Sequence, residues 1–102
     1  MIHVVAVIQA KPGKRDAVLL AAEDNLKAVR EEDGCIEYVL VVDAKFGSFQ
    51  SELGLDTFLV IEKWRDAAAL QAHAAAPHMA SYSKKIKHWI ESRVIHVLEP
   101  VT

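Results

Sequence analysis

The chain begins with an almost unbroken apolar run over residues 2–10 (IHVVAVIQA), in which β-branched side chains are frequent. Such side chains favour an extended backbone, and the Lys11-Pro12-Gly13 segment that follows favours a turn. This pattern predicts a β-strand. Similar patterns predict three further strands, over residues 36–42, 58–64 and 94–98.

In three other segments the apolar spacing is helical. Over residues 14–33, apolar side chains recur every three or four positions, and Gly34 is the residue expected to stop this helix. Asp66 is a good N-cap for a short Ala-rich helix over residues 67–75. Pro77 suits the first turn of a third helix, whose apolar stripe consists of Met79, Tyr82, Ile86, Trp89 and Ile90.

The predicted elements follow the order strand, helix, two strands, two helices, strand. This order matches the split βαβ arrangement of a ferredoxin-like fold. We therefore expect one α+β domain over residues 1–102, with an antiparallel four-stranded sheet. The segment 44–55 is too long for a plain hairpin turn, which makes it a candidate lid.

Both faces of the predicted sheet are apolar. In the first strand, Val4, Ala6 and Ile8 point to one face, while Val5 and Val7 point to the other. Helices in this topology cover only one face, so the second face needs another cover. A homodimer packed sheet against sheet supplies it. The alternative is a solvent-facing sheet with ordinary exposed valines.

Charge and cysteine content narrow the function classes. Twelve Lys and Arg residues against fourteen Asp and Glu give a formal charge of -2, without the basic excess that nucleic-acid binding requires. The single cysteine, Cys35, can form no internal disulfide, which fits a reducing cytoplasm. The N-terminal apolar run is shorter than a signal sequence or a membrane span needs. We therefore expect a cytoplasmic protein that binds neither nucleic acid nor a membrane.

Strand alternation places Phe58, Val60, Glu62 and Trp64 on one face of the third strand. A buried Glu must be paired or protonated, and an indole N–H seeks an acceptor. Both residues therefore suit the edge of a small-molecule pocket, with Phe58 as a further substrate contact. The alternative is an interface salt bridge for Glu62 and a core role for Trp64.

Polar residues on the predicted helices complete the candidate chemistry. Asn25 lies within the apolar stripe of the first helix, where its amide binds either a ligand or a backbone carbonyl. His73, His78 and Tyr82 cluster around the junction of the last two helices. A neutral imidazole there can accept a phenolic proton near neutral pH, and the alternative is a capping or surface role. The two histidines match no metal-binding motif, so no metal site is expected.

The string Ile61-Glu62-Lys63-Trp64-Arg65-Asp66, followed by His73 and then by Pro77-His78-Met79, resembles the antibiotic-biosynthesis monooxygenase superfamily. The upstream Glu31-Glu32-Asp33-Gly34-Cys35 is similar to the E-E-x-G-C segment that precedes the second strand in that superfamily. Within it, Phe49-Gln50-Ser51 resembles the YgiN-like quinol monooxygenases. The resemblance spans essentially the whole chain.

This resemblance implies a dimeric α+β barrel with a small aromatic, quinol-like substrate. It implies a cofactor-independent monooxygenase, without flavin, haem or metal, that oxidises a quinol or polycyclic phenol to a quinone with dioxygen. Catalytic roles are carried over to Trp64, His73 and His78, with Tyr82 as a polar contact. A quinone reductase that regenerates the quinol is a further partner.

Two other function classes share the fold. One is a cofactor-free isomerase of a small oxygenated metabolite, and the other is a non-catalytic dimer that binds a small ligand. Dioxygen consumption separates an oxygenase from both. For the oxygenase, the base is His73, His78 or Glu62, unless the quinol ionises spontaneously in a preorganised pocket.

Overall fold

A computed structural model describes all 102 residues of the chain. Its sheet has the strand order β2-β3-β1-β4, and every neighbouring pair of strands is antiparallel. This confirms the predicted α+β, ferredoxin-like fold. The elements are β1 (Ile2–Ala10), α1 (Arg15–Arg30), β2 (Cys35–Val41), β3 (Thr57–Trp64), α2 (Ala67–Ala74), α3 (Pro77–Ile86), a 3-10 turn (Lys87–Trp89) and β4 (Ile90–Leu98).

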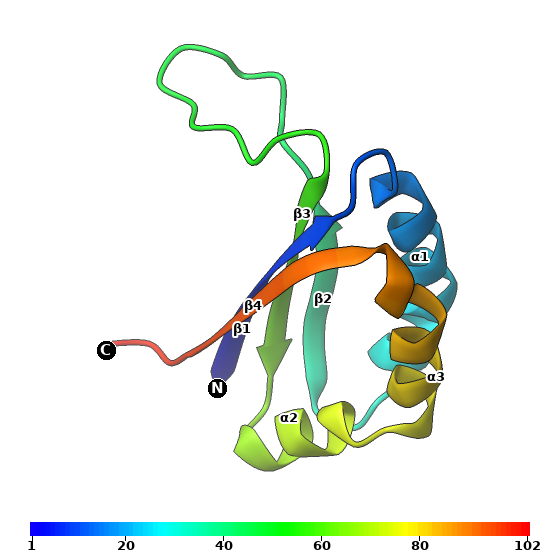
Figure 1. Cartoon of the computed structure of the whole chain (residues 1–102). Helices are drawn as coiled ribbons and strands as arrows, with labels where there is room; N and C mark the ends of the chain where they lie inside the picture. The colour runs from blue at the N-terminus through cyan, green and yellow to red at the C-terminus, as the bar shows by residue number, and fades with distance from the viewer.

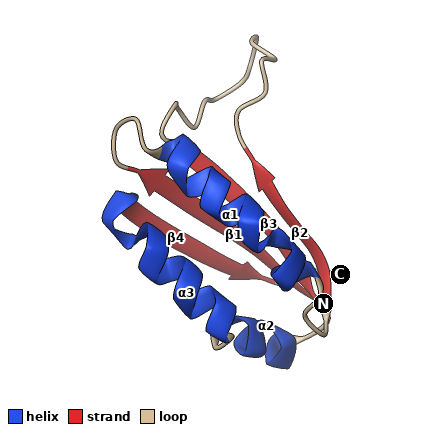
Figure 2. Ribbon diagram, turned by 90° about the vertical axis from the view of Figure 1, so that its right-hand side faces the viewer, coloured by secondary structure: helices blue, strands red, loops and turns tan.

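The helices cover one face of the sheet, as Figures 1 and 2 show from two directions. On β3 the side chains that face the helices are buried, and those that face the other way are partly exposed. Strand alternation is the reason, because successive side chains point to opposite faces. Trp64, Phe58, Val4, Val18 and Val29 are the largest fully buried side chains, and they mark the core between sheet and helices.

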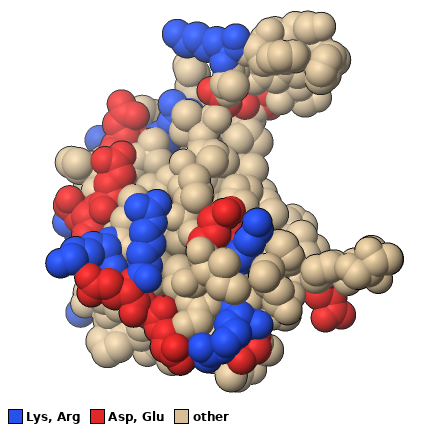
Figure 3. Space-filling view, turned by 180° about the vertical axis from the view of Figure 1, so that it is seen from behind, with Lys and Arg blue, Asp and Glu red and all other residues tan.

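No helix lies over the opposite face of the sheet (Figure 1). We call this surface the bare face, and its centre consists of Val5, Val7, Leu59 and Ile61, all partly exposed. Charged side chains gather mainly over the helices in Figure 3, while the hollow between the projecting loop and the C-terminal tail is mostly uncharged. The predicted second apolar face therefore exists.

The boundary between the last helix and the last strand differs from the prediction. α3 ends at Ile86, and β4 starts at Ile90 rather than at residue 94. The reason is backbone pairing with β1, in which Ala10 is the partner of Ile90 and the Lys11 N–H donates to the Trp89 carbonyl at 2.8 Å. Trp89 and Ile90 fit a helical stripe by spacing, but Trp89 ends the 3-10 turn and pairing with β1 makes Ile90 the first residue of β4.

Gly34 was wrongly predicted as the residue directly after the first helix. α1 ends at Arg30, and Gly34 lies three residues beyond the C-cap residue Glu31 with a φ of 86°. Its role is a close approach to α2, because a Cβ at this position would lie 2.5 Å from the Cβ of Ala69. The carbonyl of Gly34 also accepts a hydrogen bond from the Arg65 N–H at 2.8 Å. This contact fixes the turn after α1 against the start of α2.

Candidate functional site

A buried polar pair lies at the C-terminal end of β3. The indole Nε1 of Trp64 donates a hydrogen bond to Oε1 of Glu62 at 2.9 Å, and the two residues are 0% and 6% exposed. Burial raises the pKa of Glu62 above its usual range, although the hydrogen bond from Trp64 and the charge of His73 act in the opposite direction. The sequence therefore predicted correctly that these two groups point the same way and need polar partners.

His73 on α2 packs directly against this pair. Its ring centroid lies 4.6 Å from that of Trp64 and 5.6 Å from that of Tyr38. The Nδ1 of His73 is 2.8 Å from Oε2 of Glu32, and the His73 side chain is only 8% exposed. His73 is thus a buried imidazole held between aromatic rings and a carboxylate, and the surface role considered for it does not apply.

His78 and Asn25 form the second half of the arrangement. The Nδ1 of His78 is 3.2 Å from Oδ1 of Asn25, and the Asn25 amide donates to the sulfur of Met79 at 3.4 Å. The Nε2 of His78 lies 3.2 Å from the same Glu32 oxygen that binds His73, at an angle too oblique for a hydrogen bond. Asn25 therefore binds side chains rather than a backbone carbonyl.

Glu32 is the residue that sequence reasoning missed. It contacts both histidines through one oxygen, although it is 41 residues from His73 in the chain. The acidic stretch 31–33 has the composition of a solvated helix end, so its pattern gave no sign of burial. The only signal was its place in the motif that resembles the superfamily. We call Glu32, Glu62, Trp64, His73 and His78 the polar cluster.

Two predicted site residues make no hydrogen bond to the polar cluster. Phe58 is fully buried on the same face as Trp64, but six positions along an extended strand place it about 20 Å away. Tyr82 is one helical turn beyond His78 on α3 and packs against the core. Burial raises the pKa of Tyr82 to about 12, so its phenol is neutral at physiological pH.

Some polar atoms around the cluster belong to buried residues, have no hydrogen-bond partner in the protein and are still in contact with water. The only sealed, unpartnered side-chain nitrogen or oxygen atoms in the chain are Arg15 Nε and His78 Nε2. The Nε2 of His73 has no hydrogen bond and is absent from that pair, so water must still reach it. The same reasoning applies to the Tyr38 hydroxyl, which belongs to the strand partner of Glu62. Buried side chains that keep a polar atom without a protein partner and open to water have a group that a ligand can bind in place of water.

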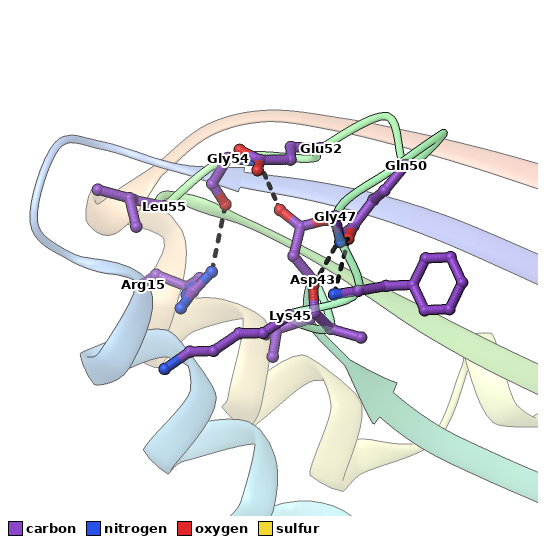
Figure 4. Close-up of a pocket in the computed structure, with 11 residues that line it drawn as sticks. Arg15, Asp43, Lys45, Gly47, Gln50, Glu52, Gly54 and Leu55 are labelled. Atoms are coloured by element: carbon purple, nitrogen blue, oxygen red, sulfur yellow. Dashed lines mark hydrogen bonds between the residues drawn. The ribbon is translucent and has the colours of Figure 1, made fainter.

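A hollow of about 570 Å³ lies away from the polar cluster. It is enclosed by the segment between β2 and β3, and Figure 4 shows its lining. The Asp43 carboxylate accepts from the backbone N–H groups of Leu53 and Gly54 there, and Gln50 binds three backbone groups of the same loop. This segment projects from the end of the sheet opposite α2 (Figure 1), so within one chain it does not cover the polar cluster.

A second hollow, of about 300 Å³, borders the cluster itself. It is lined by Glu32, by the Asp33–Arg65 ion pair and by three small side chains of α2, Ala68, Ala69 and Ala72. Glu32 therefore faces His73 on one side and an accessible hollow on the other. No group of three or more His, Cys, Asp or Glu side chains is arranged to hold a metal ion. None of the helices combines the length and the apolar character that crossing a bilayer requires.

Comparison with known proteins places this arrangement in a family. The family model described as "Antibiotic biosynthesis monooxygenase" matches residues 1–85. That match covers β1 through all but the last residue of α3 and includes every member of the polar cluster. The chain belongs to the antibiotic biosynthesis monooxygenase family.

Individual relatives agree with this membership. The chain is 38% identical over 103 residues to the "Probable quinol monooxygenase YgiN" of Escherichia coli K12, with 98% of both chains covered. It is 30% identical over 92 residues to the "Putative monooxygenase YcnE" of Bacillus subtilis, with 90% of this chain and 88% of the relative covered. The crystal structure of PA3566 from Pseudomonas aeruginosa superposes with a TM-score of 0.82 at 27% identity, covering 99% of this chain and 94% of that one.

Proposed function

We propose that this member of the antibiotic biosynthesis monooxygenase family is a cofactor-independent monooxygenase that oxidises a quinol, or a polycyclic phenol, with dioxygen. The observation that carries the proposal is the polar cluster, in which a buried imidazole has one nitrogen held by a carboxylate and the other still open to water. The name of the Escherichia coli relative, together with 38% identity over the full chain, supports the substrate class.

Oxidation of a quinol by dioxygen requires only a few steps from the protein. A deprotonated quinol is electron-rich enough to give one electron directly to dioxygen, which produces a semiquinone and superoxide. The enzyme therefore has to bind the ring, exclude bulk water and accept one phenolic proton. Tyr38 is 8% exposed and lies beside the imidazole of His73, so the cluster offers an aromatic ring next to a proton acceptor. Trp64 is 0% exposed and packs against the same imidazole from within the core, where it holds the ring in place.

The proposed reaction balances without a further reductant. The semiquinone and superoxide combine to form a carbon–oxygen bond at a ring carbon that carries hydrogen. The resulting hydroperoxide loses water as its O–O bond and the C–H bond break, and the new carbonyl tautomerises to a hydroxylated quinone. One quinol and one dioxygen thus give one hydroxyquinone and one water. A separate quinone reductase is the partner class that keeps quinone in the quinol form.

Dioxygen uptake tests this function. We expect the protein to consume one dioxygen for each 1,4-naphthoquinol, in the presence of a chelator, with one ¹⁸O from ¹⁸O₂ in the product and no hydrogen peroxide. Spontaneous oxidation gives quinone and peroxide instead, which makes a protein-free reaction the control. Anaerobic conversion would identify an isomerase. Binding of quinol without turnover would identify a ligand-binding protein, and either result contradicts the proposal.

We also propose that the bare face is the interface of a homodimer. Val5, Val7, Leu59 and Ile61 leave it apolar, and the projecting loop with its exposed Phe46 and Phe49 bends toward the same side (Figure 1). A patch of this kind is unusual on a monomer. Sedimentation at micromolar concentration is expected to give a mass near twice 11.3 kDa.

A pair of substitutions tests the interface. Ile61→Lys places a charge at the centre of the bare face and should yield monomers. Leu20→Lys is the matched control, because Leu20 is 62% exposed on α1, away from that face, and its change should leave the dimer intact. A compact wild-type monomer, or dissociation caused equally by both variants, would contradict the proposed interface.

A further inference from the structure

We propose that Glu32 is a positioning residue that fixes the tautomer of His73, and that His73 rather than His78 accepts the substrate proton. This inference rests on the proposed oxygenase function for its catalytic half only. The structural half, that Glu32 sets the state of the His73 ring, stands on the geometry of the cluster alone.

The contact between Glu32 and His73 decides which nitrogen is free. A carboxylate oxygen can only accept, so the Nδ1 of His73, 2.8 Å from Oε2 of Glu32, must carry the hydrogen. In a neutral imidazole the other nitrogen then keeps its lone pair. That atom, Nε2, is the one that has no protein partner and remains in contact with water. His73 therefore has a proton-accepting nitrogen that no protein group occupies and that water can reach.

His78 differs in both of its nitrogens. Its Nδ1 faces the Asn25 amide oxygen at 3.2 Å, and its Nε2 faces the Glu32 carboxylate at 3.2 Å while being sealed from water. Both neighbours are acceptors, so neither nitrogen directs a lone pair toward a place that a substrate can reach. We assign His78 to holding Glu32 and Asn25 in place.

The surroundings of His73 leave Glu32 as its only directed partner. Tyr38 packs against its ring from β2 and Trp64 from β3, while Glu62 contributes charge without a hydrogen bond to it. Burial raises the pKa of the Tyr38 phenol, so that group is neutral and does not compete for the proton. The Glu32 carboxylate is thus the group able to orient the ring.

The adjacent residue offers a matched control. The Glu31 side chain is 64% exposed and lies 3.7 Å from the amine of Lys27, whereas the Glu32 side chain is 15% exposed. The two carboxylates share charge, size and helix end, but only one of them touches a histidine. An effect of Glu32→Ala that Glu31→Ala does not reproduce must come from contact with the cluster.

NMR spectroscopy can determine directly which nitrogen of the His73 ring carries the hydrogen. In protein labelled with ¹⁵N at histidine, long-range ¹H–¹⁵N spectra distinguish a ring with hydrogen on Nδ1 from one with hydrogen on Nε2. At a pH where the ring is neutral, wild type and Glu31→Ala should show His73 with hydrogen on Nδ1. Glu32→Ala should lose this preference. Wild-type His73 with hydrogen on Nε2 would overturn the proposal whatever the activity.

Turnover provides the second readout. Glu32→Ala is expected to lower kcat by about 100-fold with little change in KM, because a general base contributes about that much. Formate should restore part of the rate and the Nδ1 signal, since the hollow of about 300 Å³ leads to the vacated position. A kcat that stays within twofold of wild type in Glu32→Ala would refute the positioning role.

A second pair of variants keeps the assignment testable if Glu32→Ala does not fold. His73→Gln should lose about 100-fold in kcat and His78→Gln less than tenfold, as expected if only one ring takes the proton. The reverse order would overturn the assignment of the base. If wild type consumes no dioxygen with any quinol, the proposed function fails, and the spectra still decide whether Glu32 sets the His73 tautomer.

Discussion

The two ends of β3 both carry buried or half-buried polar groups, but they use them in opposite ways. At the Thr57 end, the loop carboxylate of Asp43 and the amide of Gln50 are hydrogen-bonded to backbone groups of their own segment. At the Trp64 end, the polar cluster leaves nitrogen and oxygen atoms without partners in contact with water. The hollow at the Thr57 end is the larger of the two, whereas the Trp64 end has the polar atoms that no protein group binds.

This contrast shows that cavity size alone is a poor guide to the site. The polar groups of the loop form hydrogen bonds with one another and so fix the conformation of the loop. The polar cluster instead holds an imidazole whose free lone pair can bind a ligand. The direction of the pKa shifts follows the same division. Backbone N–H donors lower the pKa of Asp43, while burial raises that of Glu62. The surroundings of Asp43 favour its ionised form, and those of Glu62 favour its neutral form.

The largest expected effect comes from comparing glycines at the two ends. Gly34 and Gly47 both have positive φ, of 86° and 74°, but only Gly34 lacks room for a Cβ. Gly34→Ala should cost about 3 kcal/mol, from backbone strain and the clash with Ala69, while Gly47→Ala should cost about 1 kcal/mol. Urea unfolding of the two variants measures the difference. Equal losses would mean that the turn after α1 is not held against α2.

A smaller and pH-dependent effect is expected at Glu62. Its folded pKa is raised by burial, so the stability associated with the neutral acid is present at low pH and lost as pH rises through the folded pKa. Glu62→Gln has no such loss. Its stability relative to wild type should therefore increase as the pH rises above about 4.5, until the carboxyl of folded wild type is fully ionised. A difference of one between the folded and unfolded pKa corresponds to about 1.4 kcal/mol.

Thermal unfolding across this range checks the trend at Glu62. The exposed Glu52→Gln, in the loop at the opposite end, is the control and should run parallel to wild type. A relative stability of Glu62→Gln that stays flat with pH would show that Glu62 is as well solvated as the loop carboxylates. The two ends of β3 would then be equivalent in electrostatic terms.

The smallest effect is local and concerns Asp43. Its folded pKa is lowered by hydrogen bonds from the Leu53 and Gly54 N–H groups, so this stabilisation is present above its unfolded pKa and lost as pH falls through the folded one. Amide exchange should show protection of Leu53 and Gly54 that declines in acid in wild type. In Asp43→Asn the protection should be weaker and independent of pH, and an unchanged profile would separate the loop from this carboxylate.

Apolar patterning was sufficient for the order of the elements, because strand and helix periods differ plainly along this chain. It misled at Trp89 and Ile90, where helical spacing competes with pairing to β1 and the long-range pairing prevails. For the site, alternation placed Glu62 and Trp64 together correctly. It could not show that Phe58, on the same face, lies at the far end of the strand.

The sequence alone could not predict Glu32 as a site residue, for a different reason. Its contacts with His73 and His78 depend on where α1 ends and on how closely Gly34 approaches Ala69, and both are tertiary facts. A local window around residue 32 contains only charged neighbours and a glycine. Sequence reasoning without a fold therefore reads it as surface, in the same way as Glu31.

Glu31 and Glu32 point in different directions from the end of α1, so the rotation of this helix decides which of them reaches His73. Each residue of an α-helix turns the chain by about 100°, so the insertion or loss of one residue anywhere between Arg15 and Arg30 would rotate the helix end relative to the sheet. Glu32 would then swing away from His73, and an exposed position would take its place. Length changes in α1 should be tolerated only in steps of three or four residues, because the contact between Glu32 and His73 depends on the register of this helix more than on its composition.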